Sequence, residues 1–141
     1  MIPGGLYLVD TSAIARIGKE GVREVLDRLG RLGLLATCVT IDLEVLYSAR
    51  SPTEYEASAS LRATGFTDLP LHAAVGVRAK EVQAALARRS QHRAAGVMDL
   101  ITAAVAEHHS ATVLHYDADF DHIASVTRQH TQWVLPKGTV D

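Results

Sequence analysis

The sequence is poor in cysteine and has no long apolar run, and both shortages restrict the class of protein. Cys38 is the sole cysteine in 141 residues, so the chain can form neither an internal disulfide nor a cysteine-based zinc framework. No stretch approaches the roughly 18 consecutive apolar residues of a membrane span. The first residues, MIPGGLYLVD, lack the basic region and apolar core of a signal peptide. We therefore expect a cytoplasmic protein that makes no use of a membrane.

Positive charge is not in excess, and it is unevenly placed. The formal net charge is −2, which is not the strong basic excess typical of a nucleic-acid binder. No Lys or Arg occurs between Arg93 and Arg128. The acids in this gap are Asp99, Glu107, Asp117, Asp119 and Asp121. Neighbours in sequence therefore do not neutralise these carboxylates.

The chain is rich enough in apolar residues, at 48%, to bury a hydrophobic core. We expect one domain over residues 1–141. Apolar runs predict strands at 6–9, 34–39, 111–116 and 131–135, and a weak strand or loop at 66–71. Helical spacing predicts helices at 11–18, 20–32, 53–64, 72–89, 98–109 and 119–126, and another that begins near Ile41 with Thr40 as its cap. This alternation predicts an α/β fold with a central parallel sheet covered by helices on both faces.

Acidic residues follow several of these strands. Asp10 comes directly after the strand at 6–9, Asp117 follows the strand at 111–116, and Glu44 lies early in the helix after 34–39. Since parallel strands all end at one edge of the sheet, we expect these three carboxylates to meet there. Asp99 starts the helix that leads into 111–116. We expect that start at the opposite edge, so that the irregular loop at 89–96 must bring Asp99 across.

Each acid taken alone has a structural interpretation. Asp10 can cap a helix, Asp99 can favour the positive end of a helix dipole, and Asp119 and Asp121 can be solvated residues of a first helical turn. Several carboxylates at one edge would repel each other, however, and a divalent cation such as Mg²⁺ would neutralise them. The spacing D-A-D-F-D is not a calcium loop of the EF-hand type, because its sixth and twelfth positions are His122 and Arg128.

Four segments together resemble a known family. In order and spacing, the segments VDTSAIARI, LEVLYSAR, VMDLITAAVA and YDADFDHIA resemble the acidic motifs of PIN domains, and most closely those of VapC-type toxins. The resemblance implies a three-layer α/β/α fold and a Mg²⁺- or Mn²⁺-dependent endoribonuclease that cleaves RNA by metal-activated water. It further implies a homodimer that inhibits translation or growth until a cognate VapB-type antitoxin binds it.

The resemblance also implies roles for individual residues. The catalytic acids matched by the motifs are Asp10, Glu44, Asp99 and Asp117, which with Asp119 form the implied metal-ligand set. Ser12, and more loosely Thr11, match hydroxyls that support the first Asp. His115 departs from the pattern, since the family commonly has Thr or Ser two residues before the fourth acid. Whether His115 replaces that hydrogen bond or adds a pH dependence stays open.

Two further groups of side chains have open interpretations. Arg88, Arg89 and Arg93, with His92, either line an RNA groove or favour the C-terminal end of a helix. Among the other histidines, His108 and His109 are expected to face apart, and His72 is expected to stand alone.

Two rival functions remain at this point. A receiver domain that accepts a phosphoryl group has a similar length and topology, and Lys137 follows the last strand as it requires, but VDTS supplies one acid where a receiver needs two. A catalytically silent module that binds RNA or protein would not need four separated acids.

Overall fold

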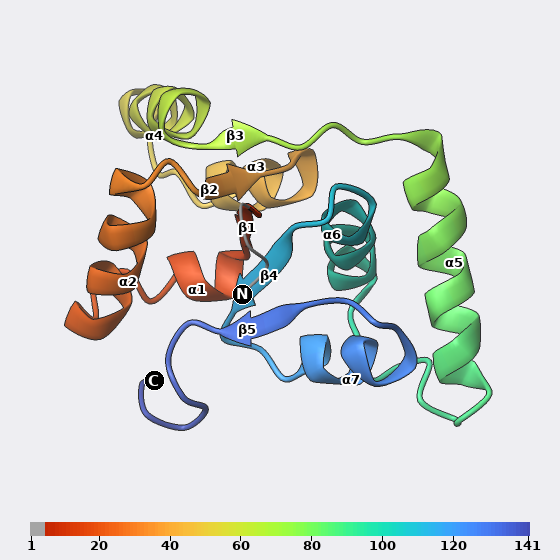
Figure 1. Ribbon diagram of the computed structural model, residues 1–141. Coiled ribbons are helices and arrows are strands. Elements are labelled where there is room, and N and C mark those ends of the chain that lie inside the picture. The colour runs from red at the N-terminus through yellow and green to blue at the C-terminus, as the bar shows by residue number, and fades with distance from the viewer. Residues whose placement is uncertain (1–4) are drawn as a thin grey trace.

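The computed structural model describes residues 5–141, and a sheet of parallel strands lies at its centre (Figure 1). Within these residues the strands are β1 (Tyr7–Val9), β2 (Leu35–Thr37), β3 (Thr67–Asp68), β4 (Thr112–His115) and β5 (Thr131–Trp133). Their order in the sheet is β3-β2-β1-β4-β5. Strands β1 and β4 are therefore central neighbours, and every residue of both is buried, as expected for a parallel sheet covered on both faces.

Helices follow or precede the strands as the alternation predicts. In residues 5–141 they are α1 (Thr11–Ile14), α2 (Glu20–Arg31), α3 (Val39–Tyr47), α4 (Pro52–Gly65), α5 (Ala73–Ala87), α6 (Val97–His108) and α7 (Asp119–Val126). The first of these is shorter than the helix expected over 11–18, because turns begin after Ile14. Ser51 starts α4 by accepting a hydrogen bond from the Glu54 amide, and Pro52 takes the first helical position.

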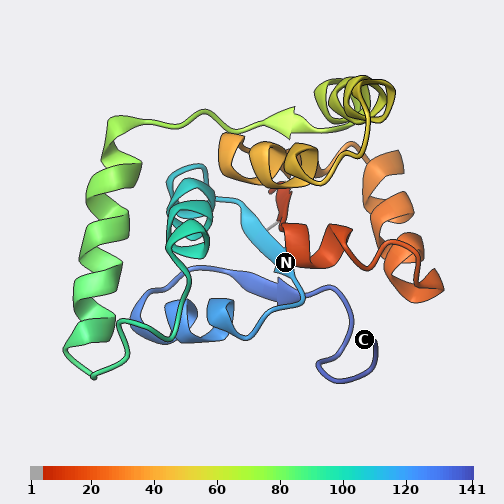
Figure 2. The same cartoon turned by 180° about the vertical axis from the view of Figure 1, so that it is seen from behind.

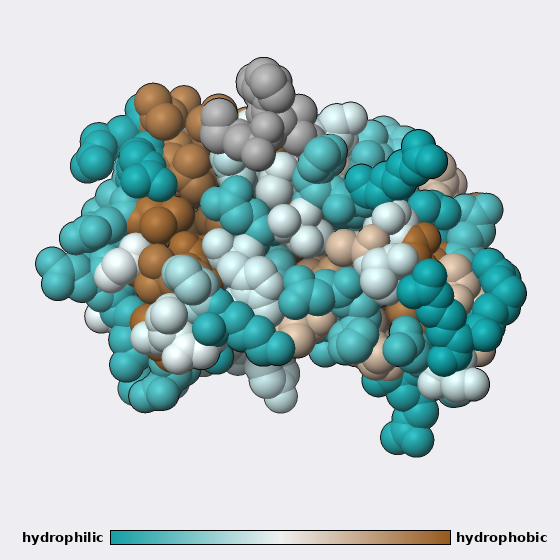
Figure 3. Space-filling view, turned by 60° about the horizontal axis from the view of Figure 1, so that its bottom comes forward, coloured by the Kyte–Doolittle hydropathy of each residue, from teal (hydrophilic) through white to brown (hydrophobic). Residues whose placement is uncertain are grey.

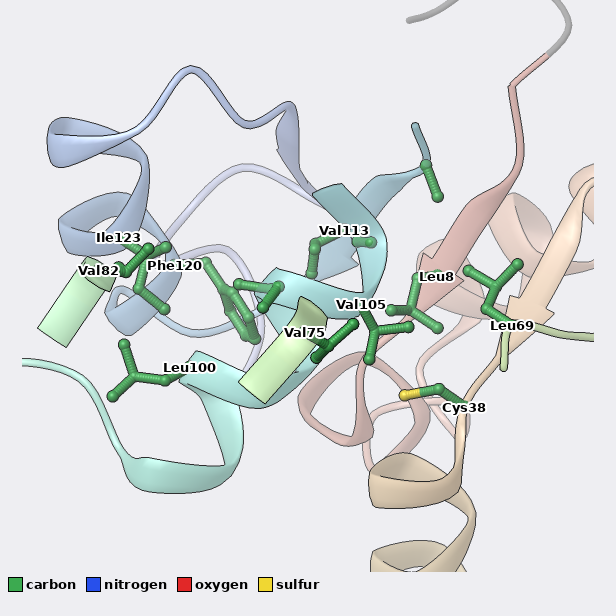
Figure 4. Packing of buried hydrophobic residues seen from close by; sticks show 14 of the residues in the cluster. Leu8, Cys38, Leu69, Val75, Val82, Leu100, Val105, Val113, Phe120 and Ile123 are labelled. Carbon is green, nitrogen blue, oxygen red and sulfur yellow. The ribbon is translucent and has the colours of Figure 1, made fainter. Parts of the chain in front are cut away.

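Two hydrophobic clusters fill the space between the sheet and the helices on its two faces. Leu8 and Val113 point to one face of the sheet, where α3, α5, α6 and α7 supply the apolar partners (Figure 4). Val9 and Leu114 point to the other face, where α1 and α2 pack. Alternation along each strand explains why neighbouring residues serve different clusters. The predicted three-layer α/β/α fold is confirmed, and Figure 2 shows the same layers from behind.

The prediction that Thr40 caps α3 is wrong. The helix begins earlier, with Cys38 at the cap position and no side-chain cap bond. Thr40 lies inside the first turn, where its hydroxyl pairs with the Thr102 hydroxyl of α6 at 3.0 Å. The residue joins two helices of the core, and Cys38 is buried beside it as expected of a small apolar side chain.

A buried arginine holds α4 against the sheet. Arg62 is 5% exposed, and its Nε donates to Asp42 Oδ1 at 2.6 Å while its Nη2 donates to Thr37 Oγ1 at 2.8 Å. Asp42 also accepts from the Thr37 hydroxyl at 2.7 Å. These bonds connect α4, α3 and β2, and they satisfy a charge that would otherwise be costly to bury.

The expectation for the histidines is also wrong. The His108 and His109 rings meet edge to face with centroids 5.0 Å apart, and His72 lies 4.7 Å from His108. Helical spacing fails to predict this because α6 ends at His108, so His109 is already a cap residue. The connection from β3 to α5 brings His72 to the same place, since α5 begins where α6 ends (Figure 1).

Candidate metal centre

Carboxylates gather at the edge where the central strands end. One oxygen from each of Asp99, Asp117 and Asp119 lies within 4.8 Å of the others, and all three side chains are half-buried. Asp10, which is 3% exposed, is near enough for its charge to act on Asp99 and Asp117. The structure thus gathers three of the five predicted metal ligands into one group and places Asp10 beside them.

Strand pairing positions Asp10. Val9 lies opposite Leu114 in the register of β1 and β4, and the Asp10 amide continues the ladder by donating to Leu114 O at 2.9 Å. Asp10 therefore leaves β1 beside the end of β4. Its Oδ2 accepts from the Ser12 amide at 2.9 Å, so Asp10 is a helix cap and a member of the cluster at once.

Asp99 reaches the cluster by a simpler route than expected. We expected α6 to start at the opposite edge, and this is wrong. The end of α6 lies next to the start of β4, with the Ala111 amide bonded to Ala106 O, so α6 runs antiparallel to β4. Its 12 residues extend about 18 Å, enough to return the first turn to the edge where β4 ends. A helix that feeds a parallel strand begins at that edge, and the loop at 89–96 is not needed to carry Asp99 across.

Local hydrogen bonds hold the last two acids. Asp117 Oδ1 accepts from the Asp119 amide at 2.9 Å, and Asp119 Oδ2 accepts from the Gly96 amide at 3.1 Å. Gly96 thereby ties the start of α6 to the start of α7. A Cβ at this position would lie 3.5 Å from an Asp99 carboxylate oxygen and 3.7 Å from one of Asp119, which are ordinary van der Waals contacts, so Gly96 lies directly beside the centre.

Burial and mutual repulsion disfavour negative charge here. Burial, a hydrogen bond with Asp119 and the charge of Asp10 raise the pKa of Asp99 to about 8. Burial, with the charges of Asp119 and Asp10, also raises the pKa of Asp117. No ion pair found within residues 5–141 involves any of these acids. Oxygen donors without a protein cation fit a hard divalent ion such as Mg²⁺ or Mn²⁺.

Glu44 lies apart from the compact trio of acids. Its Oε1 accepts from the Thr11 hydroxyl at 3.1 Å, and it lines a shallow cleft with Leu43 and Tyr47. Thr11 is adjacent to Asp10 in sequence, so Glu44 reaches the centre from α3 through one intervening side chain. Thr11 therefore orients Glu44 and not Asp10.

Ser12 supports the centre differently from the expectation. Its backbone amide, not its hydroxyl, bonds Asp10, while its Oγ accepts from the Tyr116 amide at 2.9 Å. Ser12 thus links the start of α1 to the segment that follows β4.

His115 takes the position where a hydroxyl is usual. The side chain is fully buried, and burial lowers the pKa of its imidazole. Nδ1 accepts from the Asp117 amide at 3.1 Å, so the proton of the neutral ring is on Nε2, which has no hydrogen-bond partner within the described residues. His115 therefore restrains the backbone of Asp117, and neither of its ring nitrogens is hydrogen bonded to the Asp117 carboxylate.

Asp121 does not belong to the cluster. Its carboxylate accepts from Trp133 Nε1 at 3.1 Å, and Ala118 occupies the cap position of α7. The three acids of DADFD thus separate into two members of the centre and one surface residue.

The basic side chains that bear on the expected RNA groove form two groups. Arg88, Arg89 and Arg93 are exposed at the end of α5 and in the turn after it, and Arg89 Nη1 donates to Ser125 Oγ of α7 at 3.4 Å. A second group was missed from the sequence. Arg16 and Lys137 line a cleft of ≈ 500 Å³ that includes Asp117.

Aromatic rings also line the cleft that contains Arg16 and Lys137. The Arg16 guanidinium lies 4.5 Å from the centroid of the Tyr116 ring, and Lys137 Nζ lies 5.8 Å from that of Trp133. Tyr116 Oη also accepts from the Gly138 amide at 2.7 Å, which folds the C-terminal segment over the end of β4. The sequence signal was weak, since Trp133 and Lys137 lie near each other along the chain but Arg16 and Tyr116 do not.

The fold and the acidic centre define a class of protein, the α/β/α domains with a carboxylate cluster where the parallel strands end. Residues 7–126 match the PIN domain family, and the chain belongs to that family. It is 44% identical to Ribonuclease VapC21 of Mycobacterium tuberculosis over 133 residues, which cover 94% of this chain and 96% of the relative. It is also 44% identical to Ribonuclease VapC51 of the same species over 135 residues, covering 96% and 97% of the two chains.

Solved structures agree with the fold. A chain in the crystal structure of VapBC2 from Rickettsia felis bound to a promoter DNA fragment matches with a TM-score of 0.74 at 13% identity, covering 90% of this chain and 97% of that chain. The receiver alternative is excluded by the strand order, because receivers have the order 2-1-3-4-5 and this sheet has β3-β2-β1-β4-β5. Among residues 5–141, no helix combines the length and the apolar character needed to cross a membrane.

Proposed function

We propose that the protein is a Mg²⁺- or Mn²⁺-dependent endoribonuclease and the toxin of a type II toxin–antitoxin system. The observation that carries the proposal is the convergence of Asp10, Asp99, Asp117 and Asp119 without a protein cation. The names of the relatives, which are VapC ribonucleases aligned over almost their whole length, support RNA as the substrate.

The four clustered acids would hold the metal, directly or through water. A divalent ion supplies charge neutralisation and lowers the pKa of a coordinated water, which suits hydrolysis of a phosphodiester. Glu44, whose carboxylate accepts a hydrogen bond from Thr11, would accept a hydrogen bond from a water or help hold a second ion. Ser12 and His115 restrain the backbone from which Asp117 extends, so they are positioning residues.

The cleft beside Asp117 offers a path for the RNA. Arg16 and Lys137 would pair with phosphates, and the rings of Tyr116 and Trp133 are of the kind on which unpaired bases stack. Arg88, Arg89 and Arg93 would extend the basic surface on the α5 side of the centre. An RNA strand would then cross the acids between two basic regions.

The toxin role predicts an antitoxin. The solved neighbours include VapBC complexes, and this chain has an apolar groove suited to a hydrophobic partner segment. Ile14, Ile17, Leu26, Leu61 and Phe66 line it. Figure 3 shows hydrophobic surface gathered in a strip between hydrophilic side chains. A VapB-type antitoxin would bind there and extend its tail to the acidic centre.

A homodimer is the proposed resting assembly. Leu43 and Tyr47 of α3 and Tyr55 of α4 are large apolar side chains with 59%, 91% and 47% exposure. Leu43 and Tyr47 line the cleft that contains Glu44. Burying them between two copies would remove apolar surface from water.

The test is the charge-neutral variant Asp10→Asn. The variant should remain folded and lose Mg²⁺-dependent cleavage of RNA, and EDTA should abolish cleavage by the unmodified protein. Glu56→Gln, which neutralises an exposed acid on α4, is the matched control and should cleave normally. Full cleavage by Asp10→Asn, or in EDTA, would contradict the proposal. RNA binding without any cleavage under all metals tested would favour the silent binding module instead.

A further inference from the structure

Three histidine rings form a second cluster, far from the acids. His72 precedes α5, His108 is the last residue of α6, and His109 caps that helix. One ring nitrogen from each lies within 4.8 Å of the other two. The three imidazoles come from two segments that are distant in sequence, so the cluster is a product of the tertiary fold.

One hydrogen bond orients the His109 ring and leaves its other nitrogen free to bind a metal ion. Its Nε2 lies 2.9 Å from Pro70 O, and because a carbonyl oxygen only accepts, Nε2 carries the proton. Nδ1 of the neutral ring is then left with a free lone pair. A metal-binding histidine typically donates its other ring N–H to a backbone carbonyl in this way.

The surroundings leave the imidazoles free for a cation. The cluster lies between the negative C-terminal end of α6 and the positive N-terminal end of α5, so the two helix dipoles offset each other there. The adjacent Glu107 does not compete for the site, since Arg78 Nε donates to it at 2.6 Å. His72 and His108 are exposed, so their rings can turn toward an ion and a water can occupy a fourth position.

The ligand chemistry differs from that of the acidic centre. Imidazole nitrogen suits Zn²⁺, Ni²⁺, Co²⁺ and Cu²⁺, whereas Mg²⁺ prefers oxygen. A zinc–nitrogen bond is about 2.1 Å, so the rings would close in modestly on binding. His108 follows Asp99 by nine positions of α6, which separates the two clusters by about 14 Å along the helix axis.

We propose that His72, His108 and His109 form a binding site for a transition-metal ion of the zinc class. The ion would connect the start of α5 to the end of α6, which lie beside each other at this end of the molecule (Figure 1). It would add to the Arg78–Glu107 ion pair and the His109–Pro70 hydrogen bond that already link these segments. Because binding needs the free ring nitrogens of all three residues, the site closes the connection between β3 and α5 onto the core. This site is independent of the proposed nuclease activity.

The experiment is a Zn²⁺ titration by calorimetry of untagged, chelator-treated full-length protein in excess Mg²⁺, which occupies oxygen-ligand sites but competes poorly for imidazole. The unmodified protein should bind one Zn²⁺, and His72→Ala and His109→Ala should each weaken binding at least tenfold. His130→Ala, which removes an exposed histidine outside the cluster, is the matched control and should bind normally. Thermal melts without Zn²⁺ check that each variant folds.

A second arm separates the two clusters. The double variant Asp99→Asn/Asp117→Asn should bind Zn²⁺ in Mg²⁺ as tightly as the unmodified protein, and Zn²⁺ should raise its melting temperature. The proposal is overturned if the unmodified protein binds no Zn²⁺ in Mg²⁺, if His72→Ala binds as tightly, or if the double Asp variant loses binding. Loss of RNA cleavage in the Asp10→Asn test would leave this result unaffected.

Discussion

Neutralising Asp99 should stabilise the metal-free protein. Burial and neighbouring acids raise the pKa of Asp99 from its ordinary 3.8 to about 8. Between these values the folded state holds a proton that the unfolded state releases, so stability falls as pH rises through the window from 3.8 to about 8. Asp99→Asn keeps the shape of the side chain, can still donate a hydrogen bond to Asp119, and removes the ionisation.

The size of the expected gain in stability follows from the raised pKa of Asp99. At about pH 7 the ionisation penalty has a ceiling of about 4 kcal/mol, since each pKa unit corresponds to about 1.4 kcal/mol. Asp99 is partly exposed, and solvent screening reduces the penalty, so we expect a gain of about 1–2 kcal/mol. For a chain of this length that gain corresponds to roughly 3–8 °C in melting temperature.

The assay is thermal or urea unfolding in EDTA at two pH values. Asp99→Asn should be more stable than the unmodified protein at about pH 7. The advantage should shrink at about pH 4, where Asp99 is protonated in the folded state and already partly protonated in the unfolded state. Asp121→Asn is the matched control, because Asp121 lies outside the cluster and binds Trp133, and it should gain nothing. A less stable Asp99→Asn at neutral pH, or an equal advantage at both pH values, would refute the reasoning.

Three further outcomes follow from the same structure. Mg²⁺ should bind the unmodified protein more tightly at about pH 8 than at about pH 6, because Asp99 must lose its proton to bind metal; equal affinity by titration would argue against metal at Asp99. Arg62→Ala should cost roughly 3 kcal/mol in urea unfolding, because it leaves the buried side of Asp42 without its partner, whereas Arg50→Ala, which breaks an exposed pair with Glu54, should cost little. Combined Arg16→Ala and Lys137→Ala should weaken RNA binding in EDTA and flatten its salt dependence, and an unchanged salt slope would remove that cleft from the RNA path.

Much of the fold was predictable because the buried central strands are continuous apolar runs in the sequence. The runs around Leu8 and Val113 are apolar on both faces of the sheet, which is the pattern of a parallel central strand. Helix boundaries were less predictable. Thr40 has the chemistry of a cap, but packing against Thr102 places it inside the helix, and local sequence carries no information about that partner.

Only part of the candidate centre was likewise predictable from the sequence. Asp10 and Asp117 follow directly from chain order, because each ends a strand and parallel strands end together. Asp99 was assigned by resemblance to the family motifs, and its predicted position was wrong because α6 runs antiparallel to β4. The roles of Ser12 and His115 could not be predicted from the sequence. The bond between Ser12 and Tyr116 joins segments that are distant in sequence, and the bond between His115 and Asp117 depends on how a turn closes.

The sequence by itself determined the alternating α/β order, the buried strands and the supply of acids without nearby cations, because composition and periodicity are local properties of the chain. Only the tertiary structure decided that Glu44 lies apart from the clustered acids, that Arg16 and Lys137 line a cleft beside Asp117, and that His72 meets His108 and His109. Those encounters depend on where each helix ends and which strand lies beside it. These distances are set by packing and not by spacing along the chain.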